Sequence, residues 1–269
     1  MTTLPSYNRI AVRRAIIAVA AGVLSATTLA CGTKEAPTGL QPSGTTGRIR
    51  FVNLINDPAR NPVNAILEKV PFGVNLGYAG TTPSSLPAPN TANYSAVLTG
   101  DRSLVLKKTA DTTVTVASFT LPIAANEDRT VYATGGAGGG TVTSFVTKDT
   151  MGVAIPAGQA RVRVVNMSPA AGAVDVFITA PNADLSTATP VASNVGAQAV
   201  SAYVNIPALT SFQVRAVPAG TAPANRSAAV LVSITPTTVT LAAGSGRTIV
   251  IADRAAGGGP PTAFVLTDQ

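Results

Sequence analysis

Histidine and tryptophan are absent from this 269-residue chain, and cysteine occurs once. Without histidine there is no Ser-His-Asp or Cys-His catalytic set, no imidazole metal ligand and no histidine general base. A single cysteine cannot form a disulfide within the chain. Aromatic residues make up only 4%, so the aromatic stacking surface used by many carbohydrate-binding sandwiches is small. The composition therefore predicts no metal and no cofactor.

Charge is also scarce, because Asp, Glu, Lys and Arg together make up 12% of the residues. The formal net charge of +7 includes Arg9, Arg13 and Arg14, which lie in a basic leader. Without them the net charge is about +4, which is ordinary for a soluble domain. No run is dense in Lys or Arg, so we expect no nucleic-acid partner.

Turn formers and β-branched residues are abundant. The chain has 24 Gly and 20 Pro, and 46% of its residues are hydrophobic. Short alternating apolar segments recur between turns, which is typical of an all-β protein with enough apolar residues for two cores.

The N-terminal stretch predicts an export signal. Residues 1–14 carry three arginines and no acid, and residues 15–24 (AIIAVAAGVL) form an apolar run of ten. This run is too short to span a bilayer of about 30 Å but suits the core of a signal peptide.

The only cysteine, Cys31, lies just after this run. The order Ala30-Cys31-Gly32 resembles the lipobox of bacterial lipoproteins, although Thr28 stands where Leu is usual. The resemblance implies a signal peptide over 1–30 and a diacylated Cys31 that inserts into a membrane. The alternative is ordinary cleavage after Ala30, which would leave a free thiol.

Residues 31–46 are rich in Gly, Pro, Ser and Thr and predict a flexible tether. Gly32 is not the Asp that favours inner-membrane retention in the usual enterobacterial rule. The expected location is therefore the cell envelope, lipid-anchored, at the outer membrane or periplasmic face.

An internal repeat organises the rest of the chain. Arg48–Asn53 (RIRFVN) aligns with Arg161–Asn166 (RVRVVN), about 113 residues later, a spacing suited to tandem domains. Near the ends of the copies, Arg129–Val131 aligns with Arg247–Ile249 and Phe145-Val146 with Phe264-Val265. We also expect Tyr203 to correspond to Tyr78, and Phe212–Arg215 to Tyr94–Val97.

With turns every eight to twelve residues, each copy predicts about seven strands. The fold class is thus all-β: two tandem immunoglobulin-like antiparallel β-sandwiches over residues 47–149 and 158–269, after the signal peptide and tether.

Paired arginines recur at the start of both copies. Alternation puts Arg48 and Arg50 on one face of a strand, with Ile49 and Phe51 on the other, and Val52 suggests a bulge. Because Arg161 and Arg163 repeat the pattern, these four are the candidate contacts for an anionic ligand. The alternative is a solvated strand face whose arginines have cross-strand partners among Asp, Glu and Thr.

The segment from residue 160 to 179 (ARVRVVNMSPAAGAVDVFIT) resembles the opening of a bacterial envelope family known as domain of unknown function 4397. Its members typically begin with an Arg-Val-Val-(His/Asn)-x-Ser-Pro strand, followed by a Val-Asp-Val-(Tyr/Phe) strand. The first copy matches more loosely, since Asn64 replaces the Asp and Ser-Pro is missing. The resemblance implies tandem β-sandwiches on secreted or lipid-anchored proteins, and it implies no chemistry. The residues that carry the match are Arg163, Val164, Val165, Asn166, Ser168, Pro169, Val174, Asp175, Val176 and Phe177.

The twelve acidic residues show no catalytic or calcium-binding pattern. We expect Asp175 to cap or pair with a neighbour, and the Gly-rich stretch over 135–140 to form a hairpin loop. Most other acids stand alone at predicted turns: Asp57, Asp101, Asp111, Asp149, Asp184, Asp253 and Asp268.

These observations favour a non-enzymatic, lipid-anchored envelope protein that displays two β-sandwiches for binding or structural roles. Its partner beyond the membrane would be an envelope protein or a glycan. The alternatives are a carbohydrate- or polymer-binding accessory module and, less favoured, a hydrolase that uses paired carboxylates.

Overall fold

A computed structural model describes residues 44–83, 94–149, 153–237, 239–256 and 258–268. The signal peptide and nearly all of the tether lie outside these residues. Contacts group Pro42–Gln269 into one compact unit. The expected all-β fold is confirmed, because the described elements are strands and two single-turn 3-10 helices, at Ala137–Gly139 and Pro223–Asn225.

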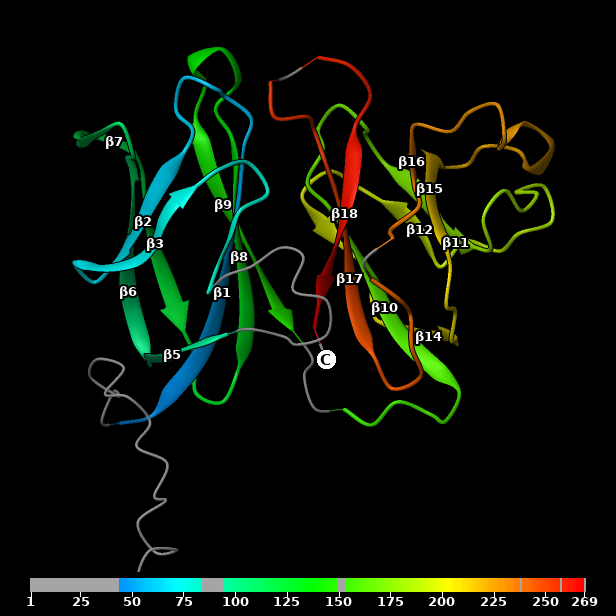
Figure 1. Ribbon diagram of the computed structural model, residues 1–269, viewed down its shortest axis with the longest axis horizontal. Helices are drawn as coiled ribbons and strands as arrows, with labels where there is room; N and C mark the ends of the chain where they lie inside the picture. The colour runs from blue at the N-terminus through cyan, green and yellow to red at the C-terminus, as the bar shows by residue number, and fades with distance from the viewer. Residues whose placement is uncertain (1–43, 84–93, 150–152, 238, 257, 269) are drawn as a thin grey trace, which may run out of the picture. The chain divides into compact units, whose positions relative to one another are not determined.

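The two copies, here called repeat 1 and repeat 2, have the same strand order (Figure 1). The strands of repeat 1 are β1 (Thr46–Ile55), β2 (Val63–Leu67), β3 (Val70–Leu76), β4 (Thr81–Thr82), β5 (Ser95–Leu98), β6 (Gly100–Lys108), β7 (Asp111–Ile123), β8 (Asp128–Gly135) and β9 (Val142–Asp149). The strands of repeat 2 are β10 (Gln159–Asn166), β11 (Val174–Thr179), β12 (Ala192–Val195), β13 (Ala199–Val200), β14 (Val204–Pro207), β15 (Gln213–Pro218), β16 (Val232–Ile234), β17 (Gly246–Ala252) and β18 (Thr262–Thr267).

Each repeat is a sandwich of two sheets. In repeat 1 the order β4-β1-β8-β9 faces β3-β2-β6-β7, and in repeat 2 β13-β10-β17-β18 faces β12-β11-β15-β16. β5 and β14 extend the edge of β1 and β10. Most pairs are antiparallel, as expected, but β1 runs parallel to β8 and β10 runs parallel to β17. Among the described residues each repeat therefore has nine strands rather than about seven, several of them only two to four residues long.

Each sandwich encloses its own apolar core. Ile49 and Phe51 of β1 point into the core of repeat 1, and Val162 and Val164 of β10 point into that of repeat 2. These are the faces that alternation predicted. Val52 does not form a bulge, because β1 keeps an unbroken register with β8 from Arg48 to Ile55.

A buried asparagine lies at or near the end of the first strand of each copy. Asn53 donates from its side-chain amide to the carbonyl oxygens of Leu76 and Gly77, at 2.9 and 3.0 Å. Asn166 donates in the same way to Gly172 and Val195, at 2.7 and 2.9 Å. These bonds tie the end of the strand to the opposite sheet, which accounts for the repeated Asn in the motif.

The sheet register corrects two of the predicted equivalences. β5 pairs with β1 as β14 pairs with β10, so Tyr94, just before β5, corresponds to Tyr203, just before β14. Tyr203 is therefore not the counterpart of Tyr78. The tail alignment is confirmed, because Val131 pairs with Val146 as Ile249 pairs with Val265.

The glycine-rich stretch is the connection between β8 and β9, as expected. Gly135 has a φ of 89°, and a Cβ there would lie 2.6 Å from the oxygen of Thr141. Only glycine fits this turn without strain.

Candidate functional site

The outward faces of β1 and β10 do not meet solvent but lie in a buried contact between the repeats, which we call the seam. Its apolar part is a cluster of Val52, Leu54, Tyr132, Val165, Met167, Val250, Ala252 and Leu266. Alternation placed the arginines on this face correctly. The expectation that the face is solvated is wrong for three of them, since Arg50 is 4%, Arg161 5% and Arg163 2% exposed. Only Arg48 has a side chain about half exposed, at 54%.

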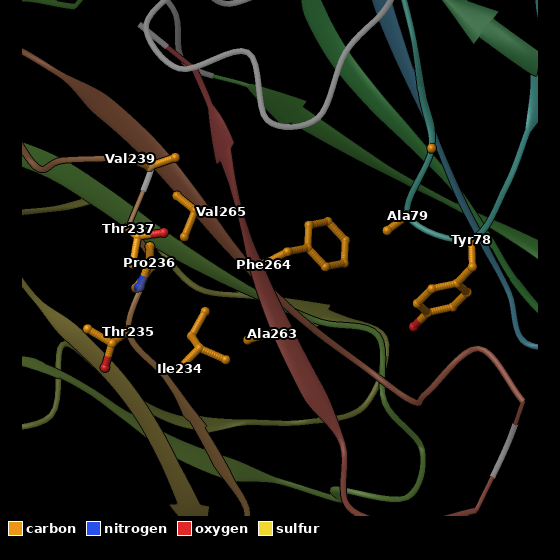
Figure 2. Close-up of a pocket in the computed structure, with 11 residues that line it drawn as sticks. Tyr78, Ala79, Ile234, Thr235, Pro236, Thr237, Val239, Ala263, Phe264 and Val265 are labelled. Carbon is orange, nitrogen blue, oxygen red and sulfur yellow. The ribbon is translucent and has the colours of Figure 1, made fainter.

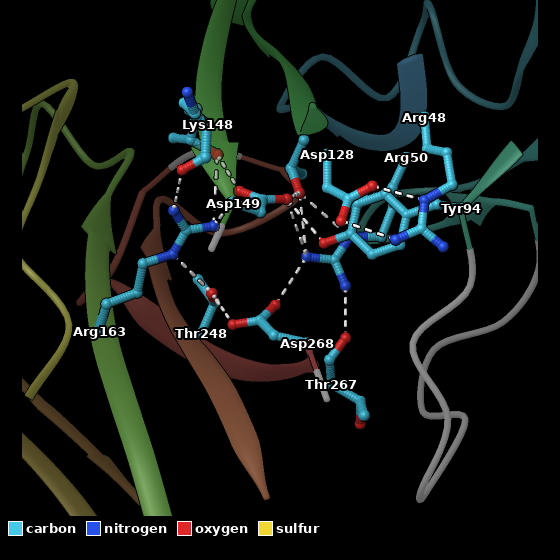
Figure 3. A network of polar contacts seen from close by, with 12 residues as sticks. Arg48, Arg50, Tyr94, Asp128, Lys148, Asp149, Arg163, Thr248, Thr267 and Asp268 are labelled. Carbon is cyan, nitrogen blue, oxygen red and sulfur yellow. Dashed lines mark hydrogen bonds and ion pairs between the residues drawn. The ribbon is translucent and has the colours of Figure 1, made fainter. Parts of the chain in front are cut away.

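Arg50 reaches from repeat 1 to the end of repeat 2 (Figure 3). Its Nη2 donates to Asp268 Oδ1 at 2.9 Å, and its Nη1 donates to the carbonyl oxygen of Thr267 at 2.6 Å. Nη2 also donates to the hydroxyl of Thr130, its cross-strand neighbour, at 2.9 Å. The guanidinium is thus held between a carboxylate of the other repeat and a threonine of its own.

Arg163 makes the reciprocal contacts from repeat 2 to the end of repeat 1 (Figure 3). Its Nη2 donates to Asp149 Oδ1, and its Nη1 donates to the carbonyl oxygen of Lys148 at 3.0 Å. Its Nε donates to Thr248, the cross-strand neighbour, at 2.8 Å. Each repeat therefore supplies one arginine and one terminal aspartate to the seam, in equivalent positions.

A tyrosine covers the arginine pair in each repeat. Arg50 lies 4.8 Å from the ring centre of Tyr94, and Arg163 lies 4.7 Å from that of Tyr203. The Tyr94 hydroxyl donates to Asp149 at 2.7 Å, and the Tyr203 hydroxyl donates to Asp268 at 3.2 Å. Burial raises the pKa of both phenols, so both stay protonated and act as donors.

The arginines of the seam remain charged. Burial acts to lower the pKa of Arg50 and Arg163, but the surrounding tyrosines and aspartates outweigh it and raise the pKa of both. Two cations and two carboxylates give a neutral set, and the side chains of Asp149 and Asp268 are fully buried. The anionic partners of Arg50 and Arg163 thus belong to this chain.

The remaining two candidates have partners in their own repeat. Arg48 forms a bidentate pair with Asp128, its parallel cross-strand neighbour, at 2.6 and 2.7 Å. Arg161 lies 5.0 Å from the ring centre of Tyr203. Cross-strand Asp or Thr partners, as expected, are thus present for Arg48, Arg50 and Arg163.

The sequence interpretation missed Asp149 and Asp268, which were taken as isolated turn residues. Their equivalent positions, each at the end of its repeat, were a signal in the aligned tails. Asp175, by contrast, was interpreted correctly, since it accepts the backbone N–H groups of Asn194 and Gly220 at 2.8 and 3.1 Å. In repeat 1 Asn64 replaces it and accepts from Asn75 N–H at 2.8 Å. The side-chain Oδ1 of Asn64 therefore accepts a backbone N–H, as the carboxylate of Asp175 does in repeat 2.

The second feature of interest is an open groove of about 530 Å³ beside β18 (Figure 2). One wall is the segment that follows β16, and the other is the turn before β4 of repeat 1, with Phe264 and β18 between them. No side chain among its described lining residues is charged. These are Tyr78, Ala79, Gly80, Ile234, Thr235, Pro236, Thr237, Val239, Ala263, Phe264 and Val265.

The groove exists because β16 is shorter than its counterpart β7. Phe119 of β7 pairs with Leu104, and Ile234 of β16 pairs with Val214 at the equivalent position. β7 continues without a break to Ile123, four residues beyond Phe119, whereas β16 ends at Ile234. In repeat 2 the chain leaves β15 after Ile234, and the next bridge is between Leu241 and Leu209, which precedes β15. The longer path contains Pro236, which has no N–H for a ladder bond.

The predicted lipidation site cannot be placed in the structure. Cys31 lies outside the described residues. Within the described part of the chain, no group of His, Cys, Asp and Glu could hold a metal ion, and no helix is long and apolar enough to cross a membrane.

Residues 47–177 match the family model described as "Domain of unknown function (DUF4397)". This range covers all of repeat 1 and ends at Phe177 in β11, the last residue of the motif quoted above. The match supports the resemblance to that family.

None of the curated proteins compared matches the chain. Among solved structures, a streptococcal family 41 carbohydrate-binding module described for α-glucan recognition is 10% identical, with a TM-score of 0.25, and the match covers 81% of this chain and 96% of the other. A second, described for α-glucan binding by a streptococcal virulence factor, is 11% identical, with a TM-score of 0.22, over 82% and 97%. At these TM-scores the likeness carries no argument about fold or ligand.

Proposed function

We propose that this protein is a non-enzymatic, lipid-anchored component of the cell envelope whose two sandwiches act together as one binding or structural body. Repeat 2 would be a second copy of the domain that repeat 1 represents, and the shared strand order supports this. Diacylated Cys31 would hold the body at the outer membrane or periplasmic face through a tether that ends at β1.

The observation that carries the proposal is that buried charged residues join the two repeats. Arg50 and Arg163 occupy equivalent positions, as do Asp149 and Asp268, and all four form ion pairs between the repeats. A buried, neutralised set of this kind gives fixed geometry rather than reactivity. The body therefore presents two sandwiches in one orientation, which suits display.

The anchor is tested by Cys31→Ser in the producing cell. Without the thiol there is no site for acylation, so we expect the variant to move from the membrane fraction to the soluble fraction after a salt wash. Thr28→Leu is the matched control, because it restores the usual lipobox residue and should leave the protein in the membrane fraction. Retention of Cys31→Ser on membranes would show that the lipid is not the anchor.

A carbohydrate- or polymer-binding module is the second candidate. Phe264 and Tyr78 beside the groove are the aromatic side chains that favour it. Binding of soluble glucans to the purified protein, measured by calorimetry, tests this alternative.

A further inference from the structure

The outer edge of β18 borders the groove and indicates what kind of ligand would fit there. β18 is the last strand of its sheet, and no other described strand pairs with its outer side. The N–H of Asp268 donates to the oxygen of Gly246 at 2.9 Å. In an antiparallel pair the bonded residues alternate, so residues 264 and 266 also bond to β17.

The backbone groups of Ala263 and Val265 therefore point away from β17, along the side where the groove lies. Thr267, the next residue in this alternation, shows the same direction, because its carbonyl oxygen accepts from Arg50 across the seam. On the stretch that lines the groove, two N–H donors and two C=O acceptors thus point away from β17, and no strand in the described part of the chain pairs with them.

Side chains on both sides of this edge are apolar. Ala263 and Val265 face the core of repeat 2, next to Val239, whereas Phe264 faces the seam. A strand added to β18 would alternate in the same way. Its side chains would point in turn toward Val239 and Ile234 and toward Phe264.

In repeat 1 there is a continuous strand, β7, where repeat 2 has the groove. There β7 runs on as an extended segment, with Phe119 packed against the core and Leu121 only 2% exposed within it. Repeat 2 lacks this continuous strand and keeps the apolar walls. A volume of about 530 Å³ falls in the range of 300–1,000 Å³ usual for ligand sites.

We propose that the groove binds an extended, uncharged peptide segment of another protein, which adds to β18 and carries apolar side chains at alternate positions. The turn that carries Tyr78 and Ala79 lies on one side of β18, and the segment Thr235–Thr237 lies on the other, so both could contact a strand added to its edge (Figure 2). Main-chain bonds would supply affinity, and the alternate apolar contacts would supply specificity. The inference rests on the proposed display function and names its partner class.

The test is selection of displayed random seven-residue peptides on the full-length protein in detergent. We expect enriched sequences with apolar residues at alternate positions and no charge between them. A synthetic peptide of the enriched sequence is then titrated against the protein and its variants by fluorescence anisotropy.

Ala263→Pro removes one outward N–H and leaves the ladder with β17 intact, which edge strands tolerate. We expect it to weaken peptide binding at least tenfold. Ser144→Pro is the matched control. Ser144 of β9 pairs with Ala133 of β8, just as Ala263 of β18 pairs with Ile251 of β17. It should change binding less than twofold.

Deletion of Thr235–Thr237 gives an independent variant, because it shortens the segment toward the spacing of β7 and closes the groove. This deletion should abolish binding of the peptide. The proposal is overturned if no alternating apolar sequence is enriched, or if both variants bind the peptide as the parent does. Binding of maltoheptaose that both variants lose would assign the groove to a glycan and also overturn it. The membrane distribution of Cys31→Ser does not depend on any of these results. The proposed lipid anchor and the proposed peptide site are therefore tested independently.

Discussion

Repeats 1 and 2 share a strand order and differ at one edge. In both, the first strand places an arginine in the seam. The aspartate that accepts from the arginine of the other repeat is the last residue of β9 in repeat 1 and follows β18 in repeat 2. β7 of repeat 1 extends over Asp111–Ile123, whereas β16 of repeat 2 covers only Val232–Ile234. The shared features join the repeats, and the difference opens the groove. The arginines and aspartates that join the repeats do not line the groove, so the two features can be changed by different substitutions.

The largest effect is expected where the repeats are alike. Arg163→Asp removes the cation that neutralises Asp149 and adds a second buried carboxylate beside it. Breaking a buried pair in this way costs about 3–5 kcal/mol, which would remove much of a typical stability of about 5–15 kcal/mol. Urea unfolding followed by circular dichroism measures the loss.

Arg254→Asp is the control for this variant, because Arg254 is exposed and such changes usually stay within about 0.5 kcal/mol. Arg50→Asp should cost as much as Arg163→Asp, since it makes the equivalent contact to Asp268. A loss below about 1 kcal/mol at both arginines would show that the repeats separate in solution.

An intermediate effect is expected where the repeats differ. Residues 121–125 (LPIAA) align with 239–243 (VTLAA). Leu121 lies in β7 and packs in the core of repeat 1, whereas Val239 packs in the core of repeat 2 and also lines the groove. Leu121→Ala leaves a closed cavity and should cost about 2–5 kcal/mol. Val239→Ala only widens an open groove and should cost about 1–1.5 kcal/mol, mainly for the carbons lost.

Urea midpoints of the two variants give this comparison directly. If Val239→Ala costs as much as Leu121→Ala, the groove is closed in solution and repeat 2 packs its edge as repeat 1 does. That result would remove the structural basis for peptide binding beside β18.

The sequence predicts the inside of each repeat better than the contact between them. Alternation identified Ile49 and Phe51 as core residues and put Arg50 on the opposite face, because a strand has a period of two. Alternation cannot say what covers that face. The cover is the other repeat, and its carboxylates lie at Asp149 and Asp268, far along the chain from the arginines they meet. Only tertiary structure brings such positions together.

The groove was beyond sequence reasoning for a related reason. Residues 121–125 (LPIAA) align with 239–243 (VTLAA), but this likeness does not distinguish a continuous strand from an interrupted one. Whether a strand continues along its neighbour depends on pairing partners such as Val214 and Leu209. The proline at position 236 was the local sign that pairing stops there.

The smallest effect concerns the tyrosines that cover the arginines. Tyr94→Phe removes one donor from Asp149, which keeps the hydroxyls of Thr130 and Thr147 and the guanidinium of Arg163. The expected cost is about 1 kcal/mol, the usual net value of one hydrogen bond. Tyr203→Phe should cost less, because its bond to Asp268 is longer, at 3.2 Å against 2.7 Å for Tyr94. Thermal unfolding of both variants would show this order, and a larger loss for Tyr203→Phe would mean that the two halves of the seam are not equivalent in strength.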